Sequence, residues 1–202
     1  ASKIGAALVG LNWRLAPPEV QFVIDNVRPT LVVDAALVAS WAACGAPSKV
    51  ADVPCFQATT HTPLLILHTS GTTGRPKGAV LTHGSITANS LNTTIACDLR
   101  SDDSTATFTP LFHTGAINVL SLPLLHRGGK VVLFPSFDPE SILEWVAKER
   151  VSILFGVPTT FEMLRDHPAF GRADFSHVRF SLCGGAPCPL GLIEVFAERG
   201  VC

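Results

Sequence analysis

The chain has 202 residues, of which 47% are hydrophobic and 15% are charged, and its formal net charge is −1. This composition excludes an intrinsically disordered chain and allows a sizeable buried core. The near-neutral charge, without a long basic run, also argues against a protein that binds nucleic acid. No apolar run approaches the roughly 20 residues that a transmembrane helix needs.

The six cysteines are scattered along the chain without a Cys-x-x-Cys pair. Their apolar neighbours predict buried free thiols. Cys183 and Cys188 form the only close pair, and no histidine or second pair at ligand spacing supports a metal site there. Free thiols fit the reducing environment of the cytoplasm.

The first 63 residues predict alternating strands and helices. Apolar runs at 6–11 and 31–33 predict two buried strands. Between them, two prolines lead into a helix with four apolar residues on one face, namely Val20, Val23, Ile24 and Val27. The segment 46–63 is rich in Pro and Thr and shows no sustained periodicity of apolar residues. It therefore predicts a connection between two lobes.

Residues 64–84, LLILHTSGTTGRPKGAVLTHG, form the most informative stretch. Two short apolar runs, at 64–67 and 79–81, predict buried strands on either side of a loop. The loop consists of small and hydroxylated residues whose backbone N–H groups can wrap an oxyanion, and its glycines accept positive φ without steric cost. Lys77 adds a mobile positive charge that suits a phosphate group.

The Walker nucleotide-binding loop does not fit this stretch. That pattern requires Gly, four residues and then Gly-Lys-Ser/Thr at the start of a helix. Here Gly71 and Gly74 are three residues apart. Lys77 follows Pro76, and Gly78 stands where Ser or Thr is needed. For the GTTG segment alone, a plain surface hairpin is the alternative interpretation.

The full string TSGTTGRPKG resembles the phosphate-binding signature of the adenylate-forming enzymes. This superfamily includes acyl-CoA synthetases, firefly luciferases and the adenylation domains of peptide synthetases. His68 stands where the usual form has another aromatic residue. The resemblance implies that the loop embraces the β and γ phosphates of ATP, that Lys77 is catalytic and that Thr69 is a ligand of Mg²⁺. The implied ATP-binding residues are Thr69, Ser70, Gly71, Thr72, Thr73, Gly74 and Lys77.

Downstream of this loop, the sequence predicts a helix from Thr82 towards Cys97 and a strand over 104–108. The next segment, TPLFHTGAINVLSLPLLHRGG, predicts a strand that ends at 110–112 with His113 at its carboxyl end. Side chains at that edge of an open α/β sheet face the crevice that ligands use. On position alone, a core histidine with a satisfied nitrogen is the more common case.

PLFH, followed by a small residue and a long apolar helix, is similar to the acyl- and aryl-CoA synthetases. In that comparison His113 lies beside the substrate carboxylate and is a catalytic residue. Peptide-synthetase adenylation domains have an Asp at this point, so His113 favours a simple carboxylic acid as substrate. Gly115, Ala116 and Asn118 are implied to line the acyl pocket.

The last third of the chain predicts three more strands, at 130–134, up to Phe155 and at 178–183. Three helices are expected, the first capped by Asp138, the second opened by Pro158 and the third over 190–199. VPTTFEML resembles a family segment whose Val157, Pro158 and Thr159 are implied walls of the acyl pocket.

The last predicted strand ends in bare backbone, where a flat ring can lie without an intervening side chain. In the family the corresponding segment supports adenine, which assigns that role to Gly184, Gly185, Ala186 and Pro187. A simple tight turn is the alternative interpretation.

These motifs together imply an α/β chain with the layered fold of the N-terminal (AMP-binding) domain of an adenylate-forming enzyme, incomplete at both ends. Residues 1–202 are expected to be part of that domain, without the C-terminal domain. In the family, the stretch beyond Cys202 carries the Mg²⁺ carboxylate, and a mobile domain carries a further lysine. Losing each group should raise the activation free energy by on the order of 3 kcal/mol. The two losses together should lower the rate by roughly four orders of magnitude, so the chain alone is not expected to be catalytically active.

The expected activity is that of an AMP-forming acyl-CoA synthetase, which activates a fatty or aryl carboxylic acid with MgATP and then forms the CoA thioester. The expected partners are a small-molecule carboxylic acid, ATP and CoA, and the protein is expected to be cytoplasmic and able to form a homodimer. Three alternatives stay open. They are a P-loop ATPase or kinase, a domain that binds nucleotide without catalysis, and an acyl-AMP ligase or luciferase-like oxygenase of the same superfamily.

Overall fold

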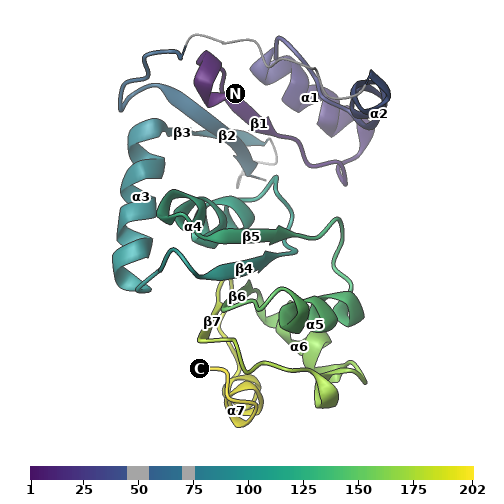
Figure 1. Cartoon of the computed structure of the whole chain (residues 1–202). Helices are drawn as coiled ribbons and strands as arrows, with labels where there is room; N and C mark the ends of the chain where they lie inside the picture. The colour runs from purple at the N-terminus through teal and green to yellow at the C-terminus, as the bar shows by residue number, and fades with distance from the viewer. Residues whose placement is uncertain (45–54, 70–75) are drawn as a thin grey trace. The chain divides into compact units, whose positions relative to one another are not determined.

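The computed structural model describes residues 1–44, 55–69 and 76–202, which form two compact units, Ala1–His83 and Gly84–Cys202 (Figure 1). The segment 46–63, where the sequence predicts a lobe boundary, belongs to the first unit and lies partly outside the described residues, so that boundary stays a prediction. In the described part of the chain, none of the helices is long and apolar enough to cross a membrane.

The first unit contains a three-stranded sheet of order β1-β2-β3. β1 (Leu8–Gly10) is parallel to β2 (Pro63–Thr69), which is antiparallel to β3 (Lys77–Thr82). Leu65 and Leu67 of β2 are buried, as its apolar run predicts. The two strands expected on either side of the phosphate loop are therefore confirmed, but the expectation that the second is buried is wrong, because Ala79 and Val80 of β3 are exposed.

The described part of the first unit also contains the helices η1 (Ser2–Ile4), α1 (Pro17–Val27) and α2 (Ala35–Cys44). α1 begins at the expected proline, and the Glu19 carboxylate accepts the Ala16 N–H at 2.9 Å to close its first turn. Val23 is buried, and the other three residues of the predicted apolar face are half-buried.

The buried strand predicted at 31–33 is wrong. Leu31, Val32 and Val33 lie outside any helix or strand and are 61%, 44% and 55% exposed. A branched apolar run becomes a strand only where another strand pairs with its backbone, and none of the described strands pairs with this run. Instead, Asp34 follows it directly and accepts the Leu37 N–H at 2.8 Å at the start of α2.

The second unit contains a parallel four-stranded sheet of order β5-β4-β6-β7. The alternation of strands and helices that the sequence predicts is confirmed, and it makes the fold α/β. The elements from residue 83 onward are α3 (His83–Ala96), β4 (Ser104–Thr107), the π-helix η2 (Gly115–Ser121), α4 (Leu122–Arg127), β5 (Lys130–Leu133), α5 (Pro139–Lys148), β6 (Ile153–Gly156), α6 (Pro158–Asp166), η3 (Phe170–Arg172), β7 (Phe180–Cys183) and α7 (Leu190–Glu198).

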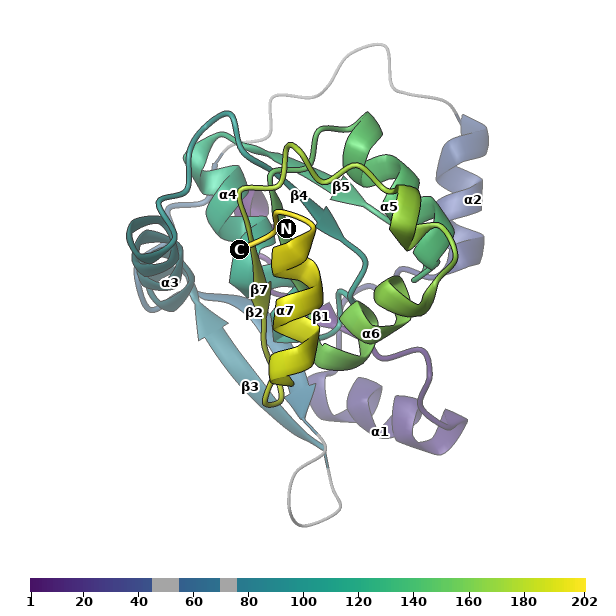
Figure 2. The same ribbon diagram turned by 90° about the horizontal axis from the view of Figure 1, so that it is seen from below.

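Helices cover both faces of this sheet (Figures 1 and 2). On one face, Ile142 of α5, Phe161 of α6 and Phe196 of α7 belong to the larger core. On the other face, η2 and α4 supply Leu120 and Leu124 to a smaller core. All four residues of β4 are buried, as expected for a strand covered on both sides. Because the strands are parallel, the carboxyl ends of β4, β6 and β7 meet at one edge.

The strand predicted to reach 110–112 ends earlier, at Thr107. Residues 111–113 form a turn, in which the His113 N–H donates to the Pro110 carbonyl at 3.0 Å. Pro110 has no N–H to give to a neighbouring strand, so the ladder cannot continue through it. His113 therefore follows β4 through a turn and does not lie directly at the end of the strand.

All six cysteines are free, as predicted, but the expectation that they are buried is wrong. Cys44, Cys55 and Cys202 are exposed, and the other three are half-buried. Apolar neighbours in sequence do not set the depth of a residue, because depth depends on which elements pack over it. Burial, and then the neighbouring Cys188 thiol, raise the pKa of Cys183 to about 11, so this thiol is uncharged at neutral pH.

A charged network holds the amino-terminal edge of the sheet. Asp103, just before β4, is 3% exposed and accepts hydrogen bonds from Arg179 Nη1 at 2.5 Å and Ser152 Oγ at 2.7 Å. Burial alone would raise the pKa of this carboxyl group, but hydrogen bonds from Arg179, Ser152 and the Arg100 N–H hold it below its ordinary value. One carboxylate thus connects the residues that precede β4, β6 and β7.

We expect Asp103→Asn to destabilise this edge by roughly 2 to 3 kcal/mol, because the Arg179 guanidinium loses its anionic partner. A fully buried pair would cost more, but the Arg179 side chain is 27% exposed. Hydrogen exchange of the β4 amides measures the change as an opening free energy. The exposed neighbour supplies the matched control, Asp102→Asn, which should change the opening free energy by less than about 0.5 kcal/mol. Equal protection of β4 in the wild type and Asp103→Asn would contradict the prediction.

The stabilisation by Asp103 should also depend on pH. Because its folded pKa lies below the ordinary value of 3.8, the unfolded chain takes up the proton at a higher pH than the folded chain. The contribution is therefore present above the unfolded pKa and is lost as the pH falls through the folded pKa. The difference in β4 protection between the wild type and Asp103→Asn should shrink over the same range.

Candidate functional site

His113 is exposed at the carboxyl edge of the second unit, in the turn between β4 and η2. Its Nδ1 accepts the backbone N–H of Gly115 at 3.1 Å. A backbone N–H can only donate, so in the neutral imidazole the proton lies on Nε2. The local backbone therefore selects the tautomer that offers an N–H donor on the far side of the ring, which suits a carboxylate.

The segment from Gly184 to Pro187 follows β7 at the same edge. The Gly184 N–H donates to the carbonyl of Gly156, the last residue of β6, at 3.1 Å. Gly185 has a φ of +82°, which L side chains rarely adopt, and a methyl group built on it would lie 3.4 Å from Val157 Cγ1. The backbone is thus free of side chains at Gly184 and Gly185 and is held to β6 through Gly184, as a surface for a flat ring requires.

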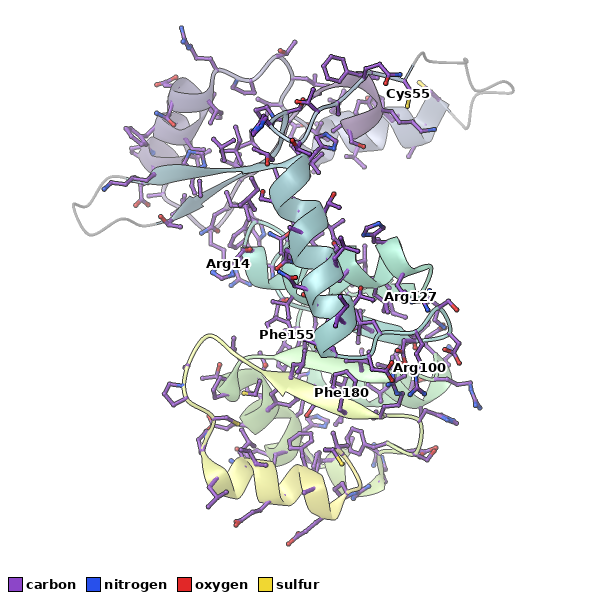
Figure 3. The ribbon with its side chains drawn as sticks, turned by 90° about the vertical axis from the view of Figure 1, so that its left-hand side faces the viewer. Arg14, Cys55, Arg100, Arg127, Phe155 and Phe180 are labelled. Atoms are coloured by element: carbon purple, nitrogen blue, oxygen red, sulfur yellow. The ribbon has the colours of Figure 1, made fainter. Side chains whose placement is uncertain are left out.

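Phe155 of β6, labelled in Figure 3, connects these two segments. A methyl group built on Gly115 would lie 3.4 Å from His113 Nδ1 and 3.4 Å from Phe155 Cε1. One built on Gly184 would lie 3.5 Å from Cε2 of the same phenyl ring. The tertiary structure therefore brings His113, Phe155 and Gly184 together, although they are far apart in sequence.

Sequence reasoning missed Phe155 and treated it only as the end of a strand. The signal that could have found it is its position near the carboxyl end of a strand in a parallel sheet, where ligands bind in open α/β folds. That signal is weak, because nothing in the sequence shows which residues of the neighbouring loops face the ring.

Of the predicted acyl-pocket residues in the π-helix, Ala116 and Asn118 are buried and Gly115 is half-buried. Asn118 is 8% exposed, and its Nδ2 donates to Thr114 Oγ1 at 2.8 Å. Its backbone carbonyl accepts the Asn89 side chain at 2.6 Å. Its Oδ1 is buried and has no hydrogen-bond partner within the described residues. Ala116 is 2% exposed, so a role for these residues in an acyl pocket stays a prediction.

Thr69 and Lys77 occupy facing positions in the register of β2 and β3, and both are exposed. Lys77 begins a strand, whereas the lysine of a Walker loop begins a helix, so the P-loop alternative does not fit the structure. The remaining predicted phosphate-binding residues lie outside the described part of the chain: Ser70, Gly71, Thr72, Thr73 and Gly74.

The stem of this hairpin is closely packed. A methyl group built on Gly78 would lie 3.1 Å from His68 Nε2 and 3.2 Å from Ile66 Cγ2, closer than side chains normally approach. Burial lowers the pKa of His68, which keeps the ring uncharged at neutral pH. A larger residue at position 78 would therefore have to shift His68 or Ile66, and the strand register places Thr69 and Lys77 opposite each other.

Magnesium prefers oxygen ligands and usually keeps several waters while it binds substrate phosphates. The exposed Thr69 hydroxyl is one such oxygen, so Thr69 fits a site completed by phosphate oxygens and water. Among the described residues, no group of three or more His, Cys, Asp or Glu side chains could hold a metal ion without such help.

The chain is similar to known proteins. The family model that matches residues 1–202 describes an AMP-binding enzyme. A feruloyl-CoA synthase from Amycolatopsis sp is 38% identical over 98% of this chain and 43% of that protein. The inhibitor-bound N-terminal domain of FACL13 from Mycobacterium tuberculosis is similar with a TM-score of 0.85 and 30% identity, over 98% of this chain and 55% of that one. ATP-bound MatB from Rhodopseudomonas palustris has a TM-score of 0.78 and 27% identity, over 97% of this chain and 43% of that one.

Proposed function

Because the chain belongs to the AMP-binding enzyme family, whose adenylate-forming members include CoA ligases, we propose that the protein containing it is an AMP-forming acid-CoA ligase. The chain spans 43% of the feruloyl-CoA synthase that it resembles, so the activity is proposed for the complete protein. The observation that carries the proposal is that Gly115, beside His113, and Gly184 both border the Phe155 ring at the carboxyl edge of a parallel sheet. The TSGTTGRPKG sequence supports it.

In the proposed first step, a carboxylate oxygen of the acid attacks the α-phosphorus of ATP. A new oxygen–phosphorus bond forms, the bond to the bridging oxygen breaks, and pyrophosphate leaves with that electron pair. His113 donates its Nε2–H to the other carboxylate oxygen and so fixes the angle of attack. Positioning and charge neutralisation supply most of the rate in such transfers.

The remaining groups bind the nucleotide. We assign adenine to the segment of Gly184, Gly185, Ala186 and Pro187, whose two glycines leave the backbone without side chains. The departing pyrophosphate is assigned to Lys77 and to the loop residues Thr69, Ser70, Gly71, Thr72, Thr73 and Gly74. The Thr69 hydroxyl would be a protein ligand of Mg²⁺, which would supply positive charge against the triphosphate.

In the second step, the thiol sulfur of CoA attacks the acyl carbonyl of the mixed anhydride and AMP leaves, which yields the thioester. The acid is a fatty or an aryl carboxylic acid, and the resemblance to a feruloyl-CoA synthase supports the aryl class. We extend the proposal to a cytoplasmic homodimer, and the six free thiols support a reducing compartment.

The test is acid-dependent exchange of pyrophosphate into ATP by the complete protein, screened over fatty and aryl acids. We expect exchange with at least one acid, and a CoA thioester with AMP once CoA is added. Release of inorganic phosphate in place of pyrophosphate would refute the proposal. Exchange that yields no thioester with CoA would favour an acyl-AMP ligase.

A further inference from the structure

We propose that Cys183 and Cys188 form a reversible disulfide that closes the segment 184–187 into a ring and weakens nucleotide binding. The two cysteines flank this segment directly in the sequence. The effect on the nucleotide rests on the function proposed above, because it concerns the segment assigned to adenine. The bond itself depends only on how the structure places the two thiols.

The side chain of Cys183 lies on the face of the sheet that α7 covers. Side chains alternate between the two faces along a strand. Phe180 and Leu182 of β7 pack against the smaller core, whereas Cys183, the last residue of the strand, packs against the larger core that contains Phe196 of α7. The Cys183 thiol is therefore directed to the side from which α7 approaches.

Cys188 reaches the same side from the other end of the segment. The chain bends at residues 185–186, where Gly185 has a φ of +82°, and Cys188 comes two residues before α7. Cys188 is half-buried and packs against the same larger core as Cys183. Both residues line one cavity of about 270 Å³. The bend thus brings the two thiols into one space.

The two thiols also interact with each other. Burial, and then a hydrogen bond with the Cys188 thiol, raise the pKa of Cys183 to about 11. That interaction requires the two sulfur atoms to be neighbours, and a disulfide brings them to about 2.05 Å from each other. In a reducing compartment such a bond is transient and forms when a disulfide oxidant accumulates.

Glutathione disulfide is an oxidant of the required chemical class. Because Cys183 stays protonated at neutral pH, Cys188 reacts first: its thiolate attacks one sulfur, and one glutathione leaves with the electron pair of the broken S–S bond. Cys183 then loses its proton and attacks the Cys188 sulfur, and the second glutathione leaves. Two protein thiols are oxidised to one disulfide, and the oxidant is reduced to two thiols that take up the two protons.

The disulfide would change the backbone on which adenine is proposed to lie. The Gly184 N–H holds one end of the segment to the Gly156 carbonyl at 3.1 Å. The bond would draw the other end, at Cys188, towards β7, so the residues between the two ends have to shift. A flat ring on this backbone then loses part of its contact.

The first measurement tests the bond without an assay of activity. The complete protein is incubated with glutathione disulfide, denatured, alkylated with iodoacetamide and digested with trypsin. Cleavage after Arg179 and Arg199 gives a peptide, 180–199, that contains both cysteines and no other. We expect this peptide to lose two hydrogen atoms and to resist alkylation, and dithiothreitol to reverse both changes. A peptide that keeps two free thiols, or carries glutathione without the internal bond, overturns the proposal.

The second measurement is equilibrium dialysis of ATP against the reduced and the oxidised protein. We expect the disulfide to raise the Kd for ATP by about three- to tenfold, the change expected for the loss of about one hydrogen bond. Cys188→Ser cannot form the bond, so its Kd should not respond to the oxidant. Cys188→Ala gives the same test without a hydroxyl group at this half-buried position, and thermal unfolding verifies that the variants are folded.

Cys202→Ser is the matched control, because Cys202 lines the same cavity. Its Kd should respond to the oxidant as that of the wild type does. A response that persists without Cys188, or that disappears in Cys202→Ser, overturns the proposed pair.

The failure of this inference differs from the failure of the proposed function. Equal Kd values for ATP in the reduced and oxidised wild type overturn the effect on the nucleotide, whatever the activity with acids. If the disulfide weakens ATP binding but no acid supports pyrophosphate exchange, the ligase function is rejected and the redox effect stands.

Discussion

Lys77→Ala in the complete protein should lower acid-dependent ATP–pyrophosphate exchange by about a hundred- to a thousandfold, the usual effect of removing one fixed group that stabilises developing charge. Lys77 is exposed at the start of β3, opposite Thr69, where the hairpin stem holds it at the base of the predicted phosphate loop. Without its ammonium group, the negative charge that builds up on the departing pyrophosphate loses a partner. We expect the KM for ATP to rise and kcat to fall together.

The matched control for this variant is Lys3→Ala, which removes an exposed lysine from η1 of the same unit. This variant should leave the KM for ATP and kcat within about twofold of the wild-type values, because substitutions of exposed residues usually have small effects. If Lys77→Ala retains the nucleotide affinity and the exchange rate of the wild type, the phosphate-binding role of the loop is rejected. The nucleotide assignments that depend on it are then rejected as well.

His113→Ala should lower kcat/KM for the acid by about ten- to a hundredfold, since a hydrogen bond to a charged group contributes roughly 1.5 to 3 kcal/mol. The KM for ATP should change little, because the proposed partner of Nε2–H is the carboxylate of the acid. Steady-state kinetics with each substrate varied in turn distinguish the two effects. His113→Gln, which keeps an N–H donor, should recover part of the loss.

His126→Ala provides the comparison for His113, since His126 is an exposed histidine in the last turn of α4 in the same unit. Removing the His126 side chain should leave kcat/KM for the acid and the KM for ATP unchanged. An equal rise of the KM for ATP and for the acid in His113→Ala would show that the substitution disturbs the whole edge. That outcome would reject the specific role in holding the acid.

Local features of the fold were predictable because they depend on residues close together in sequence. Asp138 accepts the Ser141 N–H at 3.0 Å at the start of α5, as the Asp-Pro pair predicts. Pro158 begins α6, and β6 runs through Phe155 to Gly156, each within one residue of its expected position. The apolar runs on either side of the phosphate loop pair as β2 and β3, which gives that loop its expected stem.

Part of the candidate site was also predictable, because its residues follow strands of a parallel sheet. His113 and Gly184 come from different strand ends, and the rule that such ends meet at one edge correctly predicts that they share a face of the unit. The rule does not give the path of the chain after each strand. It therefore missed the turn at Pro110 that shifts His113 away from the end of β4.

The sequence by itself determined the family and the alternation of strands and helices, and it predicts the chemistry at 69–77, 113 and 184–187, because residue type and short spacing encode these features. The tertiary structure decided that the apolar run at 31–33 lies exposed, that the cysteines lie near the surface, and that Phe155 joins His113 to Gly184. Each of those outcomes depends on which distant backbone pairs with or packs over a residue. Such long-range contacts produce no periodic pattern in the sequence.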